Sequence, residues 1–303
     1  MTETIEAPVL FETLSSGDDY RIAVATLNVP KTLNSLTAPM VDLLLPQLRA
    51  WQSDARIACV LLRGRGDRAL CAGGDVVQLR NSSLARDGKA EAFFEQEYRL
   101  DYLIHTYAKP IVVWGHGVVM GGGLGLLAGA SHRVVTAQTR LAMPEVTIGL
   151  YPDVGGTWFL NRAPGRMGLF LALTGASINA ADTLWLGLAD RFLDHAQWPQ
   201  LLDGLRTSAW GNSSDHHALV SGGLRDLEKS AGPRPSSVVR EHYDVIQELT
   251  DADSLDAVVK KITAYRGDDV WLAKAAETLA SGCPATIRLI DEQLRRGLHL
   301  SLK

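Results

Sequence analysis

The first two hundred residues alternate between two hydrophobic periods, one typical of strands and the other of helices. Apolar and polar residues alternate over 20–27 and more weakly over 9–14, so we expect a strand in each segment. Longer apolar runs at 57–62 and 110–115 indicate buried strands. The segment 69–74 is predicted to be a loop or the end of a strand. An amphipathic helix is predicted over 88–107. A second helix is predicted to begin after Thr37, which can cap it. Its apolar residues Met40, Leu43, Leu44, Leu48 and Trp51 have helical spacing and are expected to form its buried face.

The pattern changes towards the C-terminus. Short strands are still predicted at 133–136, 140–142 and 191–193. Helices are predicted at 197–207, 236–249, 253–265, 268–280 and 284–299, while Gly222-Gly223 and the run Ala231-Gly-Pro-Arg-Pro235 indicate loops. The sequence therefore predicts an α/β protein with a β/α core at 1–200 and a helical C-terminal region at 201–303.

The composition of the chain excludes only a few classes of function. The chain has 303 residues, 46% of them hydrophobic, and a net charge of −4, which argues against nucleic acid as a partner. Three cysteines without metal-ligand spacing indicate a reducing compartment, for which we expect the cytoplasm. An acidic start and the lack of a long apolar run predict neither a targeting peptide nor a membrane span.

Two glycine clusters follow predicted strands. Gly121-Gly-Gly123 opens a helix, and Cys71-Ala-Gly-Gly74 precedes an amphipathic run. Each cluster has a structural explanation, close helix packing for the first and a turn for the second. Together they offer two backbone N–H donors from separate loops, which is what an oxyanion hole requires. A dinucleotide fingerprint is disfavoured because Met120 stands at its third glycine, and the Lys-Ser/Thr pair of a phosphate-binding loop is missing.

Three acidic residues are candidates for the chemistry. Glu145 follows Pro144, and Asp153 follows Pro152, so each alone reads as a residue of a helix start. Their joint position behind the glycine helix favours a proton-handling or nucleophilic pair. Glu97 lies on an amphipathic helix, where a charge is normally solvated. A Cys71 nucleophile with His116 as its base is disfavoured, because a lone cysteine among small residues is more often buried and inert.

With these residues in place, the chain resembles the crotonase (enoyl-CoA hydratase/isomerase) superfamily, and within it the 3-hydroxyisobutyryl-CoA hydrolase branch. The resemblance runs from about residue 8 to 300. The stretches that carry it are 27–36, 69–76, 93–98, 109–125, 172–175 and the run Met143-Pro-Glu…Pro152-Asp-Val-Gly-Gly156.

The resemblance implies a spiral of ββα turns that binds an acyl-CoA. The thioester oxygen would be held by the N–H groups of Gly74 and Gly122, and Glu97 would contact substrate. Glu145 and Asp153 match the acidic pair of the hydrolases. The residues beside the donor glycines, Gly73, Asp75 and Gly121, are also expected to bind substrate. No metal or redox cofactor is implied, since coenzyme A enters as part of the substrate.

The same resemblance separates the branches of the family. Hydratases use two glutamates, and here the first of these positions is Gly125, which lacks a side chain. Loss of one proton-transfer group costs about 10²–10⁴ in rate. Hydrolysis needs one acidic residue that attacks the thioester or activates water, and we expect Glu145 in this role. It also needs a group that orients the substrate or donates a proton, and we expect Asp153 in that role. An enoyl-CoA hydratase/isomerase is the first alternative.

The C-terminal end is expected to be shorter than the family pattern, which would remove a wall of the acyl-CoA pocket. A truncated or non-catalytic acyl-CoA-binding protein is therefore the second alternative. The resemblance leaves assembly open, with homo-oligomers among the forms that relatives adopt.

Overall fold

The computed structural model describes residues 6–302, so the acidic start at 1–5 lies outside the described residues. Its larger sheet has six strands in the order β1-β2-β3-β5-β7-β10. β1 and β2 form an antiparallel hairpin, and the remaining pairs are parallel. Every residue of β5 is buried, as expected for a parallel strand that is covered on both faces. The strands are β1 Val9–Ser15, β2 Arg21–Leu27, β3 Ile57–Gly64, β5 Ile111–Gly115, β7 His132–Val135 and β10 Arg191–Phe192.

A smaller sheet has the order β4-β6-β8-β9. Successive turns of the chain give one strand to each sheet: β3 is followed by β4, β5 by β6 and β7 by β8. This repeat confirms the predicted α/β class. The smaller sheet's strands are β4 Ala69–Cys71, β6 Val118–Met120, β8 Arg140–Ala142 and β9 Ile178–Asn179.

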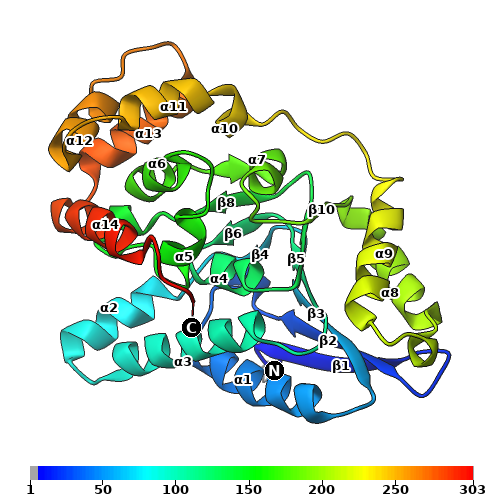
Figure 1. Cartoon of the computed structure of the whole chain (residues 1–303). Coiled ribbons are helices and arrows are strands. Elements are labelled where there is room, and N and C mark those ends of the chain that lie inside the picture. The colour runs from blue at the N-terminus through cyan, green and yellow to red at the C-terminus, as the bar shows by residue number, and fades with distance from the viewer. Residues whose placement is uncertain (1–5, 303) are drawn as a thin grey trace.

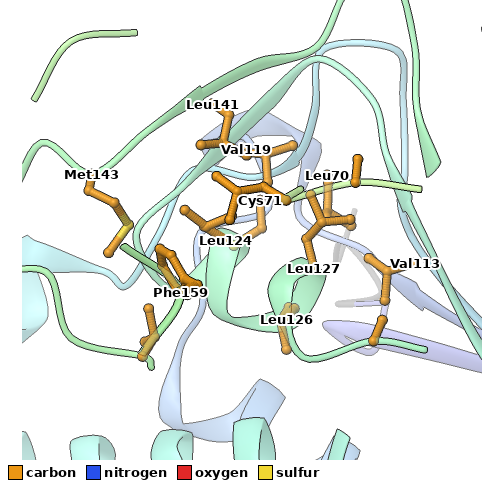
Figure 2. Packing of buried hydrophobic residues seen from close by; sticks show 14 of the residues in the cluster. Leu70, Cys71, Val113, Val119, Leu124, Leu126, Leu127, Leu141, Met143 and Phe159 are labelled. Atoms are coloured by element: carbon orange, nitrogen blue, oxygen red, sulfur yellow. The ribbon is translucent and has the colours of Figure 1, made fainter. Parts of the chain in front are cut away.

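The glycine-led helix α4 (Gly122–Ala128) is held against the smaller sheet by its leucines. Figure 2 shows Leu124 and Leu127 among side chains from β4, β6 and β8, and all of these side chains are buried. A Cβ built on Gly123 would overlap the backbone of Cys71, so a glycine there lets α4 approach β4 closely. The packing fixes where the N-terminus of α4 points. The residues labelled around α4 are Leu70, Cys71, Val113, Val119, Leu141, Met143 and Phe159.

Two longer helices flank this core (Figure 1), α1 (Ala38–Ser53) and α3 (Lys89–His105), and they pack on each other. The predicted stripe of α1 is right except at Leu43, which is 37% exposed. Val41 and Leu45 are buried instead, so the buried face is broader than the stripe predicted. The other helices up to residue 200 are α2 Val76–Ala85, α5 Gly156–Leu160, α6 Met167–Thr174 and α7 Ala180–Trp185.

Helices beyond residue 200 form two groups that lie on different sides of the core (Figure 1). α8 and α9 pack on one face of the larger sheet through Trp198, Leu201 and Val220. Of the remaining helices, α11, α13 and α14 pack on α6, α12 packs on α11 and α13, and α10 packs on α7, all as part of the main hydrophobic cluster. The boundary at residue 200 stays a prediction. These helices are α8 Trp198–Thr207, α9 His216–Glu228, α10 Val238–Glu241, α11 Tyr243–Thr250, α12 Leu255–Thr263, α13 Val270–Ser281 and α14 Pro284–Gly297.

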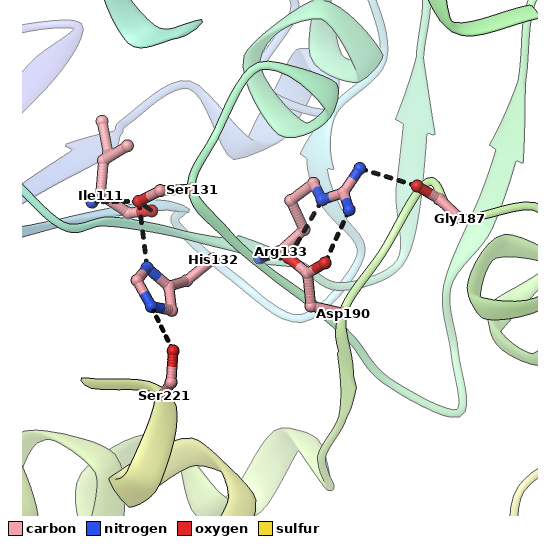
Figure 3. A network of polar contacts seen from close by, with 7 residues as sticks. All are labelled: Ile111, Ser131, His132, Arg133, Gly187, Asp190 and Ser221. Atoms are coloured by element: carbon pink, nitrogen blue, oxygen red, sulfur yellow. Dashed lines mark hydrogen bonds and ion pairs between the residues drawn. The ribbon is translucent and has the colours of Figure 1, made fainter. Parts of the chain in front are cut away.

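The loop predicted at Gly222-Gly223 is wrong, because both glycines lie inside α9. Val220 and Leu224 on either side of them are buried against the sheet, and this packing outweighs the low helix propensity of glycine. Polar contacts tie α9 to the sheet as well. In Figure 3 the ring of His132 lies between the hydroxyls of Ser131 and Ser221, at 3.0 and 2.9 Å.

The turn before β10 is fixed by the second half of the same network (Figure 3). Arg133 donates from Nε and Nη2 to the two carboxylate oxygens of Asp190, at 3.0 and 2.6 Å, and from Nη1 to the carbonyl of Gly187. Among residues 6–302, no helix is long and apolar enough to cross a membrane.

Candidate active site

A small cavity of about 70 Å³ lies where the two glycine loops meet. Its walls come from the loop after β4, from the start of α4, from α3 and from the segment 144–153. Seven of the eight site residues predicted from the sequence line it: Gly73, Gly74, Glu97, Gly121, Gly122, Glu145 and Asp153.

The N–H groups of Gly74 and Gly122 donate to no atom of the described residues. The loop that carries Gly74 is held by the Gly73 carbonyl, which accepts from the Leu36 N–H at 2.8 Å. Gly122 is the first residue of α4, where the helix leaves N–H groups without an internal partner. Gly73 and Gly121 have φ values of +103° and +47°, conformations that favour glycine. The two glycines whose backbone N–H groups are unpaired therefore line the same cavity.

Glu97 is buried, with 2% of its surface exposed, so the expectation of a solvated helix charge is wrong. Its carboxyl lies against Gly122: a Cβ built on that glycine would overlap Glu97 Oε1. Oε1 has no hydrogen-bond partner among the described residues. Burial, followed by the negative charges of Asp153 and Glu145, raises the pKa of Glu97 to about 8. The carboxyl is therefore protonated at neutral pH.

This buried acid makes stability depend on pH. The unfolded chain releases the proton of Glu97 near its ordinary pKa of 4.5, whereas the folded chain keeps it up to about pH 8. The folded state thus binds more protons in this window, and the free energy of unfolding falls as pH rises through it. We expect Glu97→Gln to raise that free energy by about 2 kcal/mol at pH 8.5 and to have little effect near pH 4.5. Thermal melts at several pH values measure this difference.

Glu95→Gln is the matched control, because Glu95 lies on the same helix but is exposed beside Arg99. Its melting temperature should follow that of the parent at every pH. A Glu97→Gln variant that melts like the parent at pH 8.5 would contradict a buried, unpartnered carboxyl.

Glu145 begins a 3₁₀ turn (Glu145–Thr147) directly after Pro144, as the sequence indicated. The carboxyl lies beside the other glycine of the loop, since a Cβ built on Gly121 would be 3.0 Å from Glu145 Oε1. Oε2 is buried and has no partner among the described residues. Burial and the nearby Asp153 raise the pKa of Glu145 to about 8. A carboxylate released from its proton here is poorly solvated and therefore reactive.

Asp153 is not the N-cap of a helix, although its position after Pro152 would allow that role. The N-cap of α5 is Gly155, and Asp153 Oδ2 instead accepts a hydrogen bond from the Tyr98 hydroxyl at 2.7 Å. Burial raises the pKa of Asp153, and the bond from Tyr98 opposes that rise. Tyr98 was not singled out in the sequence, although its place one residue after Glu97 on α3 puts it near the site.

Asp75, the eighth predicted site residue, does not line the cavity. It is the N-cap of α2, and its side chain accepts from the backbone N–H of Gln78 at 3.1 Å. Cys71 and His116 are not brought together either. Burial raises the pKa of Cys71 to about 12, and His116 lies within hydrogen-bonding distance of the Gly66 and Trp114 carbonyls.

Neighbouring side chains occupy the space that a side chain at position 125 would need. A Cβ built on Gly125 would be 2.7 Å from Val154 Cβ and 2.9 Å from each carboxyl oxygen of Asp101. Asp101, which the sequence analysis missed, lies one helical turn beyond Glu97 on α3. That spacing of four residues was the available signal, because it places both carboxyls on one face of the helix. Among the described residues, no group of histidine, cysteine and acidic side chains is arranged to hold a metal ion.

Comparison with known proteins gives one family. A family model described as enoyl-CoA hydratase/isomerase matches residues 22–303. The mitochondrial 3-hydroxyisobutyryl-CoA hydrolase of Xenopus tropicalis is 37% identical over 92% of this chain and 72% of that protein. Its human counterpart is 32% identical over the same shares.

Two solved structures are also similar. A carnitinyl-CoA dehydratase from Mycobacterium thermoresistibile has a TM-score of 0.85 at 36% identity, covering 98% of this chain and 81% of that one. An enoyl-CoA hydratase from Rhodobacter sphaeroides 2.4.1 has a TM-score of 0.81 at 34% identity, covering 97% and 80%. The names of these similar proteins describe both hydrolysis and addition or removal of water.

Proposed function

Because the chain belongs to the enoyl-CoA hydratase/isomerase family, with the spiral fold of that family, we propose that it hydrolyses the thioester of a short 3-hydroxyacyl-CoA, with 3-hydroxyisobutyryl-CoA as the substrate. One observation carries the choice of hydrolysis. The catalytic cavity is lined by Glu145 and by the two glycines with unpaired N–H groups, while the space that a side chain at position 125 would need is taken by Asp101 and Val154.

In this proposal the thioester oxygen accepts hydrogen bonds from the N–H groups of Gly74 and Gly122. Negative charge develops on that oxygen as the carbonyl carbon is attacked, and each such donor typically contributes about 10²–10³ in rate. Glu145 either removes a proton from the attacking water or attacks the carbon itself. In the second case the C–S bond breaks to give an anhydride on Glu145, and water then hydrolyses this anhydride. Asp153, fixed by Tyr98, orients the acyl group or supplies a proton to the departing thiolate.

Hydration of a double bond requires a second acid or base next to Glu145. The proteins of the two similar solved structures are named for that chemistry, but at Gly125 the space that such a side chain would need is taken by Asp101 and Val154. The similar proteins that are named as hydrolases support the choice of hydrolysis, which the geometry at Glu145 and Gly125 also favours.

The direct test compares two substrates with one preparation of the protein. Thiol release from 3-hydroxyisobutyryl-CoA should be readily detected, whereas crotonyl-CoA should keep its enoyl absorbance. Loss of enoyl absorbance without thiol release would show a hydratase instead. Binding of both thioesters without any turnover would show a non-catalytic acyl-CoA-binding protein.

The proposal also predicts a pH profile. Glu145 acts only as a carboxylate, and its pKa is raised to about 8. We therefore expect kcat/KM to rise from pH 6 to about pH 8 and then to level, after subtraction of the uncatalysed hydrolysis. Asp153→Asn removes a negative charge that raises the pKa of Glu145, so the rise should move to lower pH even though the rate falls. A profile that is flat from pH 6 to 9 in the parent would rule out an ionising Glu145.

The cellular setting follows as part of the same proposal. Acyl-CoA is the partner, with coenzyme A bound as part of the substrate and no further cofactor, and the reaction would serve valine degradation. All three cysteines are free, which suits a reducing compartment, for which we propose the cytoplasm. We also propose that a homo-oligomer is among the forms of this chain in solution, as the resemblance to the family implies.

A further inference from the structure

A second, larger cavity lies on the other side of Asp153. Its volume is about 320 Å³, within the range of small-molecule sites. Asp153 lines both cavities, so the two lie next to each other at this residue. Aromatic side chains form much of its wall, among them Tyr102, Tyr151 and Trp158, and Leu302 lies at its edge beside Gly155.

One carboxyl in this wall lacks a partner. Asp101 lines the cavity together with Gly125, and both of its carboxyl oxygens are buried without a hydrogen bond to any described residue. Buried polar side chains nearly always have a partner, so an unpaired one calls for an explanation. The missing side chain at Gly125 leaves just the space that the Asp101 carboxyl occupies.

The position of the acyl group follows from the proposed reaction. With the thioester oxygen at Gly74 and Gly122, and the carbonyl carbon beside Glu145, the acyl carbons must extend away from the glycine loops. Glu97 already lies against Gly122, whereas Asp153, on the other wall of the catalytic cavity, also lines the larger cavity. A hydroxyl on carbon 3 then lies two carbons beyond the carbonyl, among the residues around Asp153.

We propose that the cavity beyond Asp153 receives the acyl group and that Asp101 binds its 3-hydroxyl, which makes Asp101 the residue that selects hydroxylated acyl groups. This inference rests on the proposed function, because it takes the thioester to be held by the two glycine loops.

The chemistry of Asp101 suits a hydroxyl. Burial, followed by the charges of Glu97 and Asp153, raises the pKa of Asp101 well above its usual range, which favours the protonated carboxyl. A neutral carboxyl has one donor and spare acceptor capacity, and a hydroxyl likewise donates and accepts. An acyl group without the hydroxyl leaves the buried carboxyl unpaired, and sites of this kind reject such analogues.

The test measures binding, so that it does not depend on turnover. In a Glu145→Gln background, calorimetry gives the dissociation constants of 3-hydroxyisobutyryl-CoA and of isobutyryl-CoA, which has the same carbon skeleton without the hydroxyl. We expect the hydroxylated thioester to bind about tenfold more tightly. Adding Asp101→Leu should reduce that ratio to about one by weakening only the hydroxylated ligand. Adding Asp101→Asn, which keeps a donor and an acceptor, should preserve a clear preference.

Glu95→Gln in the same background is the matched control and should keep the full preference, because Glu95 is exposed on α3. A ratio unchanged by Asp101→Leu, or no preference before Asp101 is changed, would overturn the assignment. If Asp101→Leu fails to fold, Asp101→Ser provides the same comparison with a shorter side chain that withdraws from the ligand. A protein that binds with the expected preference but whose parent form releases no thiol would leave Asp101 as the selecting residue and reject the hydrolase.

Discussion

Glu145→Gln should lower kcat for thiol release from 3-hydroxyisobutyryl-CoA by about 10²–10⁴-fold. Glutamine keeps the size of the side chain, so the carboxamide should occupy the place beside Gly121 where the carboxyl lies now. It can neither form an acyl intermediate nor accept a proton from water. The Kd for the substrate should change little, because the thioester is held by backbone donors. Steady-state kinetics and calorimetry together separate the two effects.

Asp75→Asn serves as the comparison for this result. Asp75 caps α2 outside the catalytic cavity, and asparagine is an equally good cap. This variant should therefore keep its activity within about twofold, in contrast to the sequence-based expectation that Asp75 binds substrate. Equal rates for the parent and Glu145→Gln would remove Glu145 from the mechanism.

Gly122→Ala should have the second large effect, a loss of about 10²–10³-fold in kcat. The added methyl group would overlap Glu97 Oε1 and lie 3.1 Å from Leu36 Cδ1. Either the Glu97 carboxyl must leave its place or the backbone at the start of α4 must shift. We expect either change to disturb the hydrogen bond from the N–H of residue 122 to the thioester oxygen. Because that hydrogen bond strengthens as charge develops, the loss should appear in kcat more than in KM.

Gly223→Ala is the matched control for the glycine. A Cβ at this position in α9 meets nothing within 4 Å, and alanine is the better helix former. Its activity should equal that of the parent, and its stability should rise slightly. Full activity in Gly122→Ala would show that the N–H of residue 122 has no part in catalysis.

Elements whose hydrophobic pattern is local could be predicted from the sequence. The strands at β2, β3 and β5 and the helices α3, α8 and α12 to α14 were predicted within a few residues, because burial of one face leaves a period in the chain itself. The glycine clusters and the acids Glu145 and Asp153 were also visible, since each follows a strand or a proline at a recognisable spacing.

Roles within the glycine run were not visible. The three neighbouring glycines cannot be distinguished in the sequence, but each has a different role in the structure. Gly121 adopts a positive φ beside Glu145, Gly122 makes room for Glu97, and Gly123 makes room for Cys71 of β4. Each requirement comes from a different segment, so no local pattern records it.

The sequence by itself thus determined the α/β class, the family resemblance and the two glycine loops, because these depend on short patterns along the chain. Only the tertiary structure decided that Glu97 is buried, that Asp101 fills the space at Gly125, and that α9 continues through Gly222 and Gly223. A charge on a helix face looks the same in sequence whether water or another carboxyl lies opposite. The packing of α3 against the start of α4 settles that difference here.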